Sequence, residues 1–444
     1  MPFSNEEEEL IFKLGPGTPS GELFRRYWIP VETSANLGGG RGPVMPSAKN
    51  PLPLKVLGEY LVLYRDATGK PGLLAEHCSH RGVSLRYGRV EDDGLRCLYH
   101  GWLYDREGNC LDMPAEPPDR KFRTSVKHPS YPCIEVGGLI FAYMGPAELQ
   151  PSFPRYPALF RTDGVRVTGK GNRIQKSNAL LQTLDNVLDV WHREILHGWF
   201  KGQPPVGGLH HGRDDEPASP IKFELTPWGA CYVTLQNTRK PGVYEYHETH
   251  AIFPCQRGRQ NSMNWAVPID DYTTRWFGVT FEPFDENGEI PDAVYLRMHA
   301  DTPADSGGPF YEGWVEDVGH WWNTGHPLRQ GPIWEDEIAM GTQAPAERGR
   351  IPDFEKWTFG SSDKGLLLMH KLWKEQISRI QDGIDPVGII RGEEGEQMIP
   401  VPGHVLSVER EEGQRLFDRD INERINAGLE ALSGGSGSKV RDRS

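Results

Sequence analysis

Residues 78–100 read CSHRGVSLRYGRVEDDGLRCLYH. The stretch contains a Cys-x-His pair, Cys78 and His80, and a Cys-x-x-His pair, Cys97 and His100. Two thiolates and two imidazoles can ligate one zinc ion. They can also hold an iron–sulfur cluster in which one iron has sulfur ligands and the other has histidine ligands. The spacing of the two pairs and the rest of the chain decide between these two kinds of site.

The mixed composition of each pair favours the cluster. Structural zinc sites usually group like ligands, as Cys-x2–4-Cys and His-x3–5-His, whereas each pair here joins one Cys to one His. Two loops of this kind can clamp a flat cluster from both sides, each with one thiolate and one imidazole. Gly82 and Gly101 permit a close approach of the backbone, and Trp102 can shield one side. A zinc site with mixed ligands remains the alternative.

The composition is that of a globular protein with room for two domains. The chain has 444 residues, of which 37% are hydrophobic and 25% are charged. A net charge of −13 argues against nucleic-acid binding as the main function, because the sequence-independent affinity comes from Lys and Arg. No apolar run approaches the roughly 20 residues that span a bilayer, and the start MPFSNEEEEL is acidic, unlike a signal peptide. We therefore expect a cytoplasmic protein that binds neither nucleic acid nor membrane.

The hydrophobic pattern predicts two domains and an α+β fold. Residues 27–147 contain short apolar segments such as YLVLYR and LIFAYM, bounded by Gly and Pro, which predict a small antiparallel β domain. Residues 148–432 combine helical periodicity with long alternating segments such as KFELTPWGACYVTLQN, which predict a larger domain with one antiparallel sheet. Residues 1–26 are expected to pack on this larger domain. Residues 433–444 have almost nothing apolar to bury, and we expect them to be disordered.

A second group of candidate ligands lies in the segment NVLDVWHREILHG, residues 186–198. Asn186, Asp189 and His192 fall at i, i+3 and i+6 and are predicted to share one helix face. His197 follows His192 by five positions, about 140° round an ideal helix, so the helix must end or bulge between them. Two His ligands and one carboxylate form the site of non-haem Fe(II) oxygenases. Two unrelated surface histidines on a helix are the alternative.

The remaining histidines and cysteines carry less weight. His247 and His250 alternate along a predicted strand and should point to opposite faces of the sheet, so joint metal binding is not expected. Six cysteines are too few for a disulfide scaffold in a chain of this length. Four of them are expected to be buried, unreactive residues: Cys110, Cys133, Cys231 and Cys255.

The motifs CSHRG and CLYHGWLYD together resemble the Rieske domain of ring-hydroxylating oxygenases. The pattern Asn-x-x-Asp-x-x-His-x4-His resembles the iron motif of the same family, in the same order along the chain. The resemblance runs from about residue 15 to about residue 391, and it is strongest to the phthalate dioxygenase and O-demethylase branch. It implies a small antiparallel β Rieske domain joined to a larger helix-grip (START-like) catalytic domain.

This resemblance also implies two cofactors. A Rieske [2Fe-2S] cluster would be held by Cys78, His80, Cys97 and His100. A mononuclear non-haem Fe(II) would be held by His192, by His197 and by a third ligand further along the chain.

The third ligand is assigned by resemblance alone. The segment IWEDEIAMGTQAPAER resembles the Asp-containing helix of the family, and its position selects Asp336. Glu335 stands where the family more usually has Gln, and Glu337 follows directly. The two glutamates therefore remain alternative carboxylate ligands.

Asp189 has two possible roles. In the resembled family an aspartate at this position bridges the iron-site His of one subunit to a Rieske His of its neighbour. By that resemblance, Asp189 would link His192 to His100 of an adjacent chain, and electrons would cross between the subunits of a ring-shaped homotrimer. Alternatively, Asp189 accepts an N–H from His192 within one chain and only orients the ring.

The resemblance implies the terminal oxygenase component of a multicomponent Rieske system. The sequence has no flavin or nicotinamide motif, so the electrons are expected from a separate NAD(P)H-dependent reductase, with a ferredoxin as an optional intermediary. We expect oxidation of an aromatic acid by O2, in particular O-demethylation of a methoxylated, lignin-derived acid such as dehydrodivanillate. The alternatives are cis-dihydroxylation of a phthalate-like acid and, in a different class, a non-enzymatic Rieske electron carrier.

Overall fold

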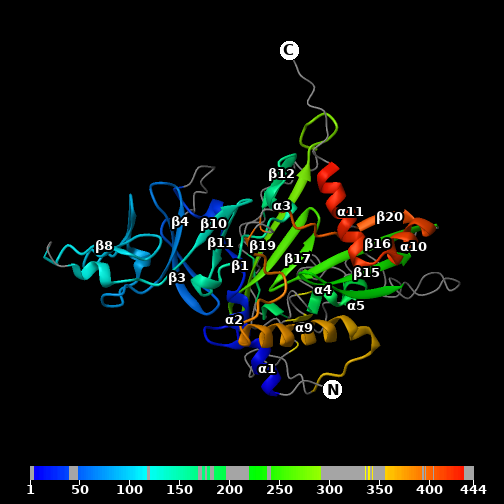
Figure 1. The fold of residues 1–444 in the computed structure, drawn as a ribbon, viewed down its shortest axis with the longest axis horizontal. Coiled ribbons are helices and arrows are strands. Elements are labelled where there is room, and N and C mark those ends of the chain that lie inside the picture. Colours follow the sequence, from blue (N-terminus) through cyan, green and yellow to red (C-terminus); the bar gives the residue numbers. More distant parts are fainter. Residues whose placement is uncertain are drawn as a thin grey trace, which may run out of the picture.

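The computed structural model of the protein combines helices with open antiparallel sheets, as the sequence predicts for an α+β fold (Figure 1). None of the helices it describes is long and apolar enough to cross a membrane. The structure describes residues 5–39, 49–117, 121–168, 173–175, 178–180, 185–196, 220–237, 242–291, 336, 339–340, 343, 356–392, 395, 397–403 and 405–434.

Three small antiparallel sheets lie where the sequence predicts a β domain. The first has the order β1-β11-β10, the second β2-β3-β4-β9 and the third β5-β6-β7-β8. Their strands are β1 (Trp28–Thr33), β2 (Leu52–Val56), β3 (Glu59–Arg65), β4 (Pro71–Ala75), β5 (Arg89–Glu91), β6 (Gly94–Arg96), β7 (Leu103–Tyr104), β8 (Cys110–Asp112), β9 (Ser130–Tyr131), β10 (Cys133–Val136) and β11 (Leu139–Tyr143).

Strand β3 has buried side chains on both faces. Alternate residues of a strand point to opposite sides, so Leu61 and Leu63 join the main core of the molecule, whereas Val62 and Tyr64 join a smaller core. The smaller core contains the predicted cluster thiols and the residues around them: Cys78, Leu85, Leu95, Cys97, Trp102, Tyr104, Cys110 and Met113. The two cores therefore share this strand, and the cluster loops are anchored to the rest of the protein through it.

One nine-stranded sheet dominates the remainder, as predicted (Figure 1). Its order is β12-β19-β18-β17-β16-β15-β14, with β13 beside β19 and β20 beside β16, and every pairing is antiparallel. The strands are β12 (Gly164–Thr168), β13 (Arg173–Gln175), β14 (Ile221–Thr226), β15 (Gly229–Asn237), β16 (Val243–Ile252), β17 (Gln256–Arg259), β18 (Ser262–Asp270), β19 (Thr273–Pro283) and β20 (Val405–Glu409).

The small sheets are joined to the large one by polar contacts. Arg275 in β19 donates from Nη2 to both carboxylate oxygens of Glu32 in β1, at 2.9 Å each. Lys55 in β2 donates to Asp270 at the end of β18 at 2.8 Å.

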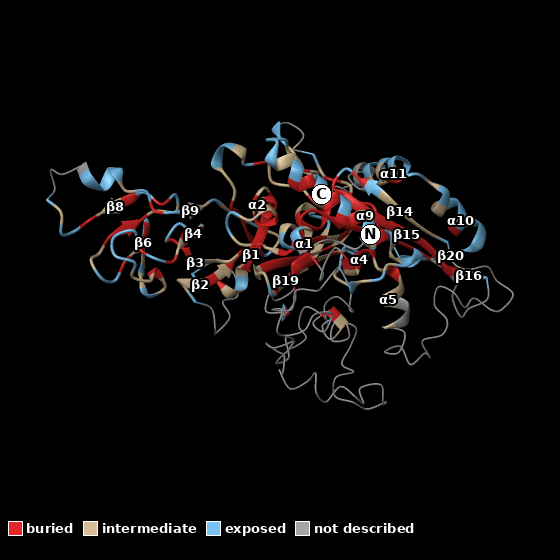
Figure 2. Cartoon of the chain, turned by 90° about the horizontal axis from the view of Figure 1, so that it is seen from below, coloured by how far each residue is buried: buried red, intermediate tan, exposed pale blue. Residues whose placement is uncertain are grey.

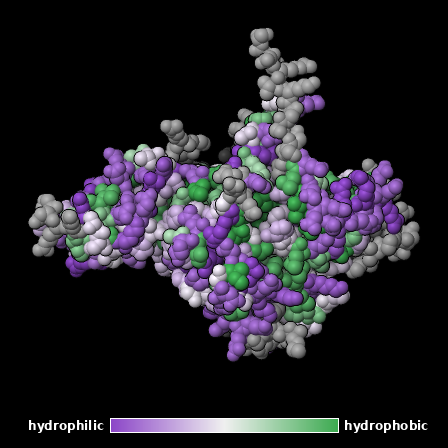
Figure 3. Space-filling view, in the orientation of Figure 1, coloured by the Kyte–Doolittle hydropathy of each residue, from purple (hydrophilic) through white to green (hydrophobic). Residues whose placement is uncertain are grey.

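Hydrophilic residues cover most of the visible face over the small sheets, and hydrophobic residues gather in patches nearer the middle of the molecule (Figure 3).

The long helix α9 packs between the N-terminal segment and the large sheet. Its Trp373 is fully buried, with ring centroids 5.6 Å from Phe24 and 5.0 Å from Phe253, and its indole N–H donates to Ser20 Oγ at 2.7 Å. Side chains of the N-terminal segment, Ser20 and Phe24, thus pack on this helix. The helices are α1 (Asn5–Phe12), α2 (Pro19–Arg25), α3 (Pro157–Phe160), α4 (Asn186–Leu188), α5 (Val190–Ile195), α9 (Lys364–Gln381), α10 (Arg410–Asp418) and α11 (Ile421–Gly434).

The end of α11 falls within the tail that the sequence predicts to be disordered. The helix continues to Gly434, and residues 435–444 lie outside the described part of the chain.

The buried residues concentrate where α9 and the other helices meet the large sheet (Figure 2).

The two faces of β16 are covered by different helices. Odd-numbered residues such as His247 face α5, where His247 contacts Arg193. Even-numbered residues such as Glu248 and His250 face α11, where Glu248 contacts Arg424. The prediction that His247 and His250 point to opposite faces is therefore confirmed.

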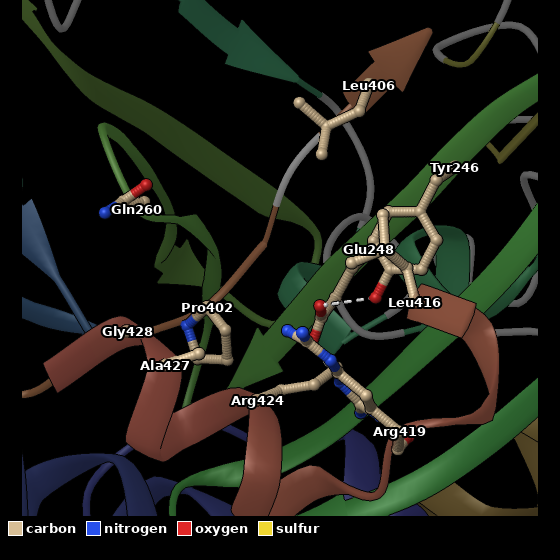
Figure 4. A pocket seen from close by; sticks show the side chains of 10 residues that line it. All are labelled: Tyr246, Glu248, Gln260, Pro402, Leu406, Leu416, Arg419, Arg424, Ala427 and Gly428. Atoms are coloured by element: carbon tan, nitrogen blue, oxygen red, sulfur yellow. Dashed lines mark hydrogen bonds and ion pairs between the residues drawn. The ribbon is translucent and has the colours of Figure 1, made fainter. Parts of the chain in front are cut away.

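A buried network of charges joins α11 to the sheet (Figure 4). Arg424 donates from Nε to Glu248 at 2.8 Å and from Nη2 to Glu224 at 2.6 Å. Tyr246 and His250 also bond Glu248, at 2.9 and 3.1 Å. Burial would raise the pKa of Glu248, but the hydrogen bond from His250 and the Arg424 guanidinium hold it at about 2. A cavity of about 190 Å³ adjoins this network between β16, α10 and α11.

Replacing Arg424 should destabilise the protein strongly. In Arg424→Met, two carboxylates remain in a largely buried place without their cation, so we expect the free energy of unfolding to fall by about 3–5 kcal/mol. Chemical denaturation measures this change. The matched control is Arg415→Met in α10, because Arg415 is exposed and its ion pair with Glu412 lies at the surface. Equal effects of the two substitutions would contradict this account.

Candidate redox and iron centres

The two loops that carry the predicted cluster ligands have the same backbone hydrogen bonds. In the first loop, Cys78 N–H donates to the carbonyl five residues later at 3.0 Å, and its own carbonyl accepts from Gly82 N–H at 2.9 Å. In the second, Cys97 makes the same two bonds, at 2.8 Å and, with Gly101, at 3.1 Å. Both glycines have a positive φ, +71° and +76°, which side chains disfavour. The sequence thus builds the same turn twice, with a cysteine at the base of each.

The four predicted ligands separate into a pair of thiols and a pair of imidazoles. Cys78 and Cys97 are buried, at 4% and 3% exposure. Burial raises the pKa of the Cys97 thiol, and its contact with the Cys78 thiol raises it further. His80 is exposed and His100 half-buried, and their ring centroids lie 4.5 Å apart. Trp102 stacks on His80 at 4.6 Å, so it shields one imidazole as the sequence suggested.

This separation fits a two-metal cluster better than one zinc ion. Bonds of about 2.0–2.3 Å to a tetrahedral zinc would hold all four ligand atoms roughly 3.3–3.8 Å from one another. Among the described residues, only one group of three or more ligand atoms from Cys, His, Asp or Glu lies within 4.8 Å, and it is elsewhere: Cys231, Glu248 and His250. Buried thiols at the base and imidazoles at the tip match the two irons of a Rieske cluster, one with sulfur and one with histidine ligands.

Two residues behind the first loop were not identified from the sequence. The hydroxyl of Tyr104 lies 3.2 Å from Cys78 Sγ, and its ring stacks on His128 at 4.5 Å. His128 is fully buried, and burial lowers its pKa. Its Nε2 lies 2.9 Å from the Ala75 carbonyl, which can only accept, so Nε2–H donates and Nδ1 accepts from the Ser79 hydroxyl at 2.7 Å. A neutral His128 therefore ties the first loop to the end of β4.

The second constellation brings three predicted residues together around one imidazole nitrogen. The Asn186 amide nitrogen lies 3.1 Å from Nε2 of His192 and 3.3 Å from Oδ1 of Asp336. Nε2 of His192 and Oδ1 of Asp336 are 3.6 Å apart. Residues 150 positions apart in sequence thus meet, and the donor set of imidazole and carboxylate suits a divalent iron.

Asp189 interrupts the helix that the sequence predicts to be continuous. Its backbone (φ −83°, ψ 89°) separates α4 from α5, and its carboxylate accepts the N–H groups of Trp191 and His192 at 3.1 and 3.2 Å. Such a side-chain cap satisfies the free donors at a helix start. Asn186 and His192 still converge, although they lie on two short helices and not on one helix face.

Asp189 also fixes the ring of His192. Its backbone carbonyl bonds Nδ1 of His192, and its carboxylate oxygen Oδ2 lies 3.7 Å from the same nitrogen. Nε2 is then left to face Asn186 and Asp336. Burial raises the pKa of the Asp189 carboxyl. These contacts are those expected for ring orientation within one chain, and the bridge to His100 of a neighbouring chain stays a prediction.

His197, Glu335 and Glu337 lie outside the described residues. The helix α5 ends at Ile195, so a helix end does separate His192 from the position of His197, as predicted.

Comparison with known proteins identifies a Rieske domain and relatives that are oxygenase subunits. Residues 31–132 match the Rieske [2Fe-2S] domain. The chain is 31% identical to the phenoxybenzoate dioxygenase subunit alpha of Ectopseudomonas oleovorans, over 84% of this chain and 85% of that one. It is 30% identical to the 5,5'-dehydrodivanillate O-demethylase oxygenase subunit of Sphingobium sp., over 90% and 86%. A shorter match, 41% over 60% and 58%, is to the tert-butanol monooxygenase / tert-amyl alcohol desaturase oxygenase subunit of Aquincola tertiaricarbonis.

Solved structures share the fold. The oxygenase of carbazole 1,9a-dioxygenase, in complex with its ferredoxin, aligns with a TM-score of 0.53 at 20% identity, over 86% of this chain and 97% of that one. NdmA of Pseudomonas putida CBB5 aligns with a TM-score of 0.51 at 19% identity, over 82% and 94%. With its Rieske domain and two relatives at least 30% identical over more than four fifths of their length, the chain belongs to the Rieske-type oxygenases, as an oxygenase subunit.

Proposed function

We propose that the protein is the terminal oxygenase of a multicomponent Rieske system that oxidises an aromatic acid with O2. The observation that carries this proposal is the presence of two separate centres, the paired loops of the small sheets and the convergence of Asn186, His192 and Asp336. A simple electron carrier needs only the first. Relatives named for phenoxybenzoate, dehydrodivanillate and phthalate support an aromatic acid as the substrate.

The first centre would hold the [2Fe-2S] cluster on Cys78, Cys97, His80 and His100. When bound, the cluster supplies one-electron transfer. The buried thiols keep water from one side of the site, whereas the exposed imidazole of His80 leaves the other side open to a partner. The Tyr104 hydroxyl can donate to the Cys78 sulfur, because a thiolate ligand only accepts.

The tip around the imidazoles is suited to a separate electron-transfer protein. Two large side chains between the ligands Cys97 and His100 are exposed: Leu98 and Tyr99. Exposed aromatic side chains are enriched at protein interfaces. The ferredoxin in complex with the carbazole 1,9a-dioxygenase oxygenase supports a partner of this kind. We propose that a separate NAD(P)H-dependent reductase supplies its electrons.

The second centre would hold mononuclear Fe(II) on His192, His197 and Asp336, which supplies the oxygen chemistry when bound. Asp189 holds Nδ1 of His192, so Nε2 is kept aimed at the site. Asp189 would also be the contact to His100 of the adjacent subunit in a homotrimer, which would carry electrons from one chain to the next.

The reaction we favour is O-demethylation. Insertion of one oxygen atom into a methoxy C–H bond gives a hemiacetal, which releases formaldehyde and a phenol, while the second oxygen leaves as water with two electrons and two protons. The dehydrodivanillate O-demethylase relative supports this choice. The phenoxybenzoate and phthalate dioxygenase relatives support the alternative, cis-dihydroxylation of the ring.

A single-turnover assay with labelled O2 tests the reaction. Reduced, iron-loaded protein is mixed with methoxylated and unmethoxylated aromatic acids, with tert-butanol as a neutral comparison. We expect formaldehyde and a phenol from a methoxylated acid such as 5,5'-dehydrodivanillate. A product that gains two labelled oxygen atoms without formaldehyde would show a ring dioxygenase instead, and turnover of tert-butanol alone would exclude an aromatic acid.

Substitution of the cysteines tests the cluster ligands. We expect Cys78→Ser and Cys97→Ser each to lose the cluster, because a hydroxyl replaces a thiolate ligand. Cys110→Ser is the matched control, since Cys110 is buried in the same core but contacts the Asp112 carbonyl at 3.5 Å. Iron and acid-labile sulfide contents are the readout. A cluster that survives in Cys78→Ser and Cys97→Ser, or is lost in Cys110→Ser, would refute this ligand assignment.

A further inference from the structure

Three arginines gather around a buried tyrosine on the face of the large sheet toward α5. Arg193 of α5 donates from Nη1 to the hydroxyl of Tyr232 in β15 at 3.0 Å. Arg257 of β17 lies on the same face, because it pairs with Ala251 while Tyr232 pairs with Thr249, and the charges of Arg257 and Arg259 both act on this hydroxyl. Burial would raise the pKa of Tyr232, but the charges of the three arginines bring it below its usual value. The space around this hydroxyl therefore favours negative charge.

The arginines of β17 lie close to one another. Arg259 donates from Nε to Thr249 Oγ1 at 3.1 Å. Burial lowers the pKa of Arg259, and the charges of Arg257 and Arg193 lower it further. Like charges held together in a partly buried place repel one another, so the arrangement is stabilised when an anion lies among them.

His247 contacts this cluster but adds no positive charge to it. Its Nδ1 lies 2.8 Å from Nη1 of Arg193, a group that only donates, so Nδ1 accepts and the ring is neutral. Its Nε2–H then donates to Glu245 at 2.9 Å. Burial and the Arg193 charge lower the pKa of His247 to about 4. Glu245, with 44% of its side chain exposed, lies at the rim of the cluster.

The opposite face of the same sheet shows how the protein treats a structural arginine. There, Arg424 is bonded to the two carboxylates of Glu248 and Glu224. Within the described part of the chain, by contrast, neither Arg257 nor Arg259 forms an ion pair. Among the described residues, the charges of Arg257 and Arg259 on the face toward α5 are therefore not balanced by a carboxylate bonded to either of them.

This cluster adjoins the proposed iron centre. Arg193 directly follows His192 in α5, so the same short helix presents an imidazole to Asp336 and a guanidinium to the sheet. We propose that Arg193, Arg257 and Arg259 bind the carboxylate of the substrate. Guanidinium groups bind carboxylates through two parallel hydrogen bonds, which fix orientation as well as charge. This inference rests on the proposed function and identifies the residues that select an acid over a neutral substrate.

Binding of matched acids and amides to the iron-loaded protein tests the proposal without turnover. The probes are 3-phenoxybenzoate, phthalate and 5,5'-dehydrodivanillate, each paired with its carboxamide, measured by calorimetry. We expect the acids to bind more tightly than the amides. We expect Arg259→Gln to weaken the acids about 10- to 100-fold, as for loss of a charge-assisted hydrogen bond, and to leave the amides unchanged.

Two controls separate charge recognition from folding. Arg415→Gln makes the same charge change at the exposed surface of α10 and should leave both classes of probe unaffected. Arg259→Lys keeps the charge but loses the planar fork, and it should bind the acids with intermediate affinity.

Several results would overturn the proposal. These are failure of all three acids to bind at millimolar concentration, equal binding of acid and amide, or an Arg259→Gln variant with lower thermal stability but unchanged affinity. The last result would mean that a carboxylate of the chain itself occupies the cluster. The proposed function fails separately: arginine-dependent binding without O2-dependent product would refute the reaction and leave the binding site standing. O2-dependent turnover of an aromatic acid that is unchanged in Arg259→Gln would refute the binding site alone.

Discussion

The separation of two buried thiols from two outward imidazoles is the constraint on which the rest of the structure depends. Cys78 and Cys97 lie in a small apolar core, whereas His80 is exposed beside His100 at the tip. No three of these ligand atoms lie within 4.8 Å of one another, so the arrangement fits a flat two-iron cluster better than a single ion. One end of the site is thereby closed to water, and the other is open to a protein that delivers electrons.

The large sheet serves two purposes on its two faces. Toward α11, the buried arginine is neutralised by carboxylates, and the contact is structural. Toward α5, Arg193, Arg257 and Arg259 surround Tyr232 next to the helix that carries His192, and in the described part of the chain neither arginine of β17 forms an ion pair. The alternation of β15 and β16 keeps these environments apart, because successive side chains point to opposite faces. One face of the sheet is thus held by ion pairs within the chain, and the other is the face that we propose binds the substrate carboxylate.

Much of the fold and of the candidate site could be predicted because its signals are local. The two cluster loops are contiguous motifs with glycines at fixed positions, and the large sheet follows from alternating hydrophobic residues. The interruption of the helix at Asp189 was not predicted. An Asp side chain that caps a new helix competes with continuation of the old one, and the pattern of hydrophobic residues carries no sign of such a cap. His128 and the cluster of Arg193, Arg257 and Arg259 were not predicted either, because only folding brings such distant residues together.

The central claim, two iron centres of different kinds in one chain, is tested most directly by metal analysis combined with Mössbauer spectroscopy of iron-loaded protein. The account predicts about three irons and about two acid-labile sulfides per chain. After reduction it predicts two inequivalent cluster irons and a separate high-spin ferrous iron. Stoichiometric zinc in place of the cluster, or a cluster with no third iron, would contradict the account.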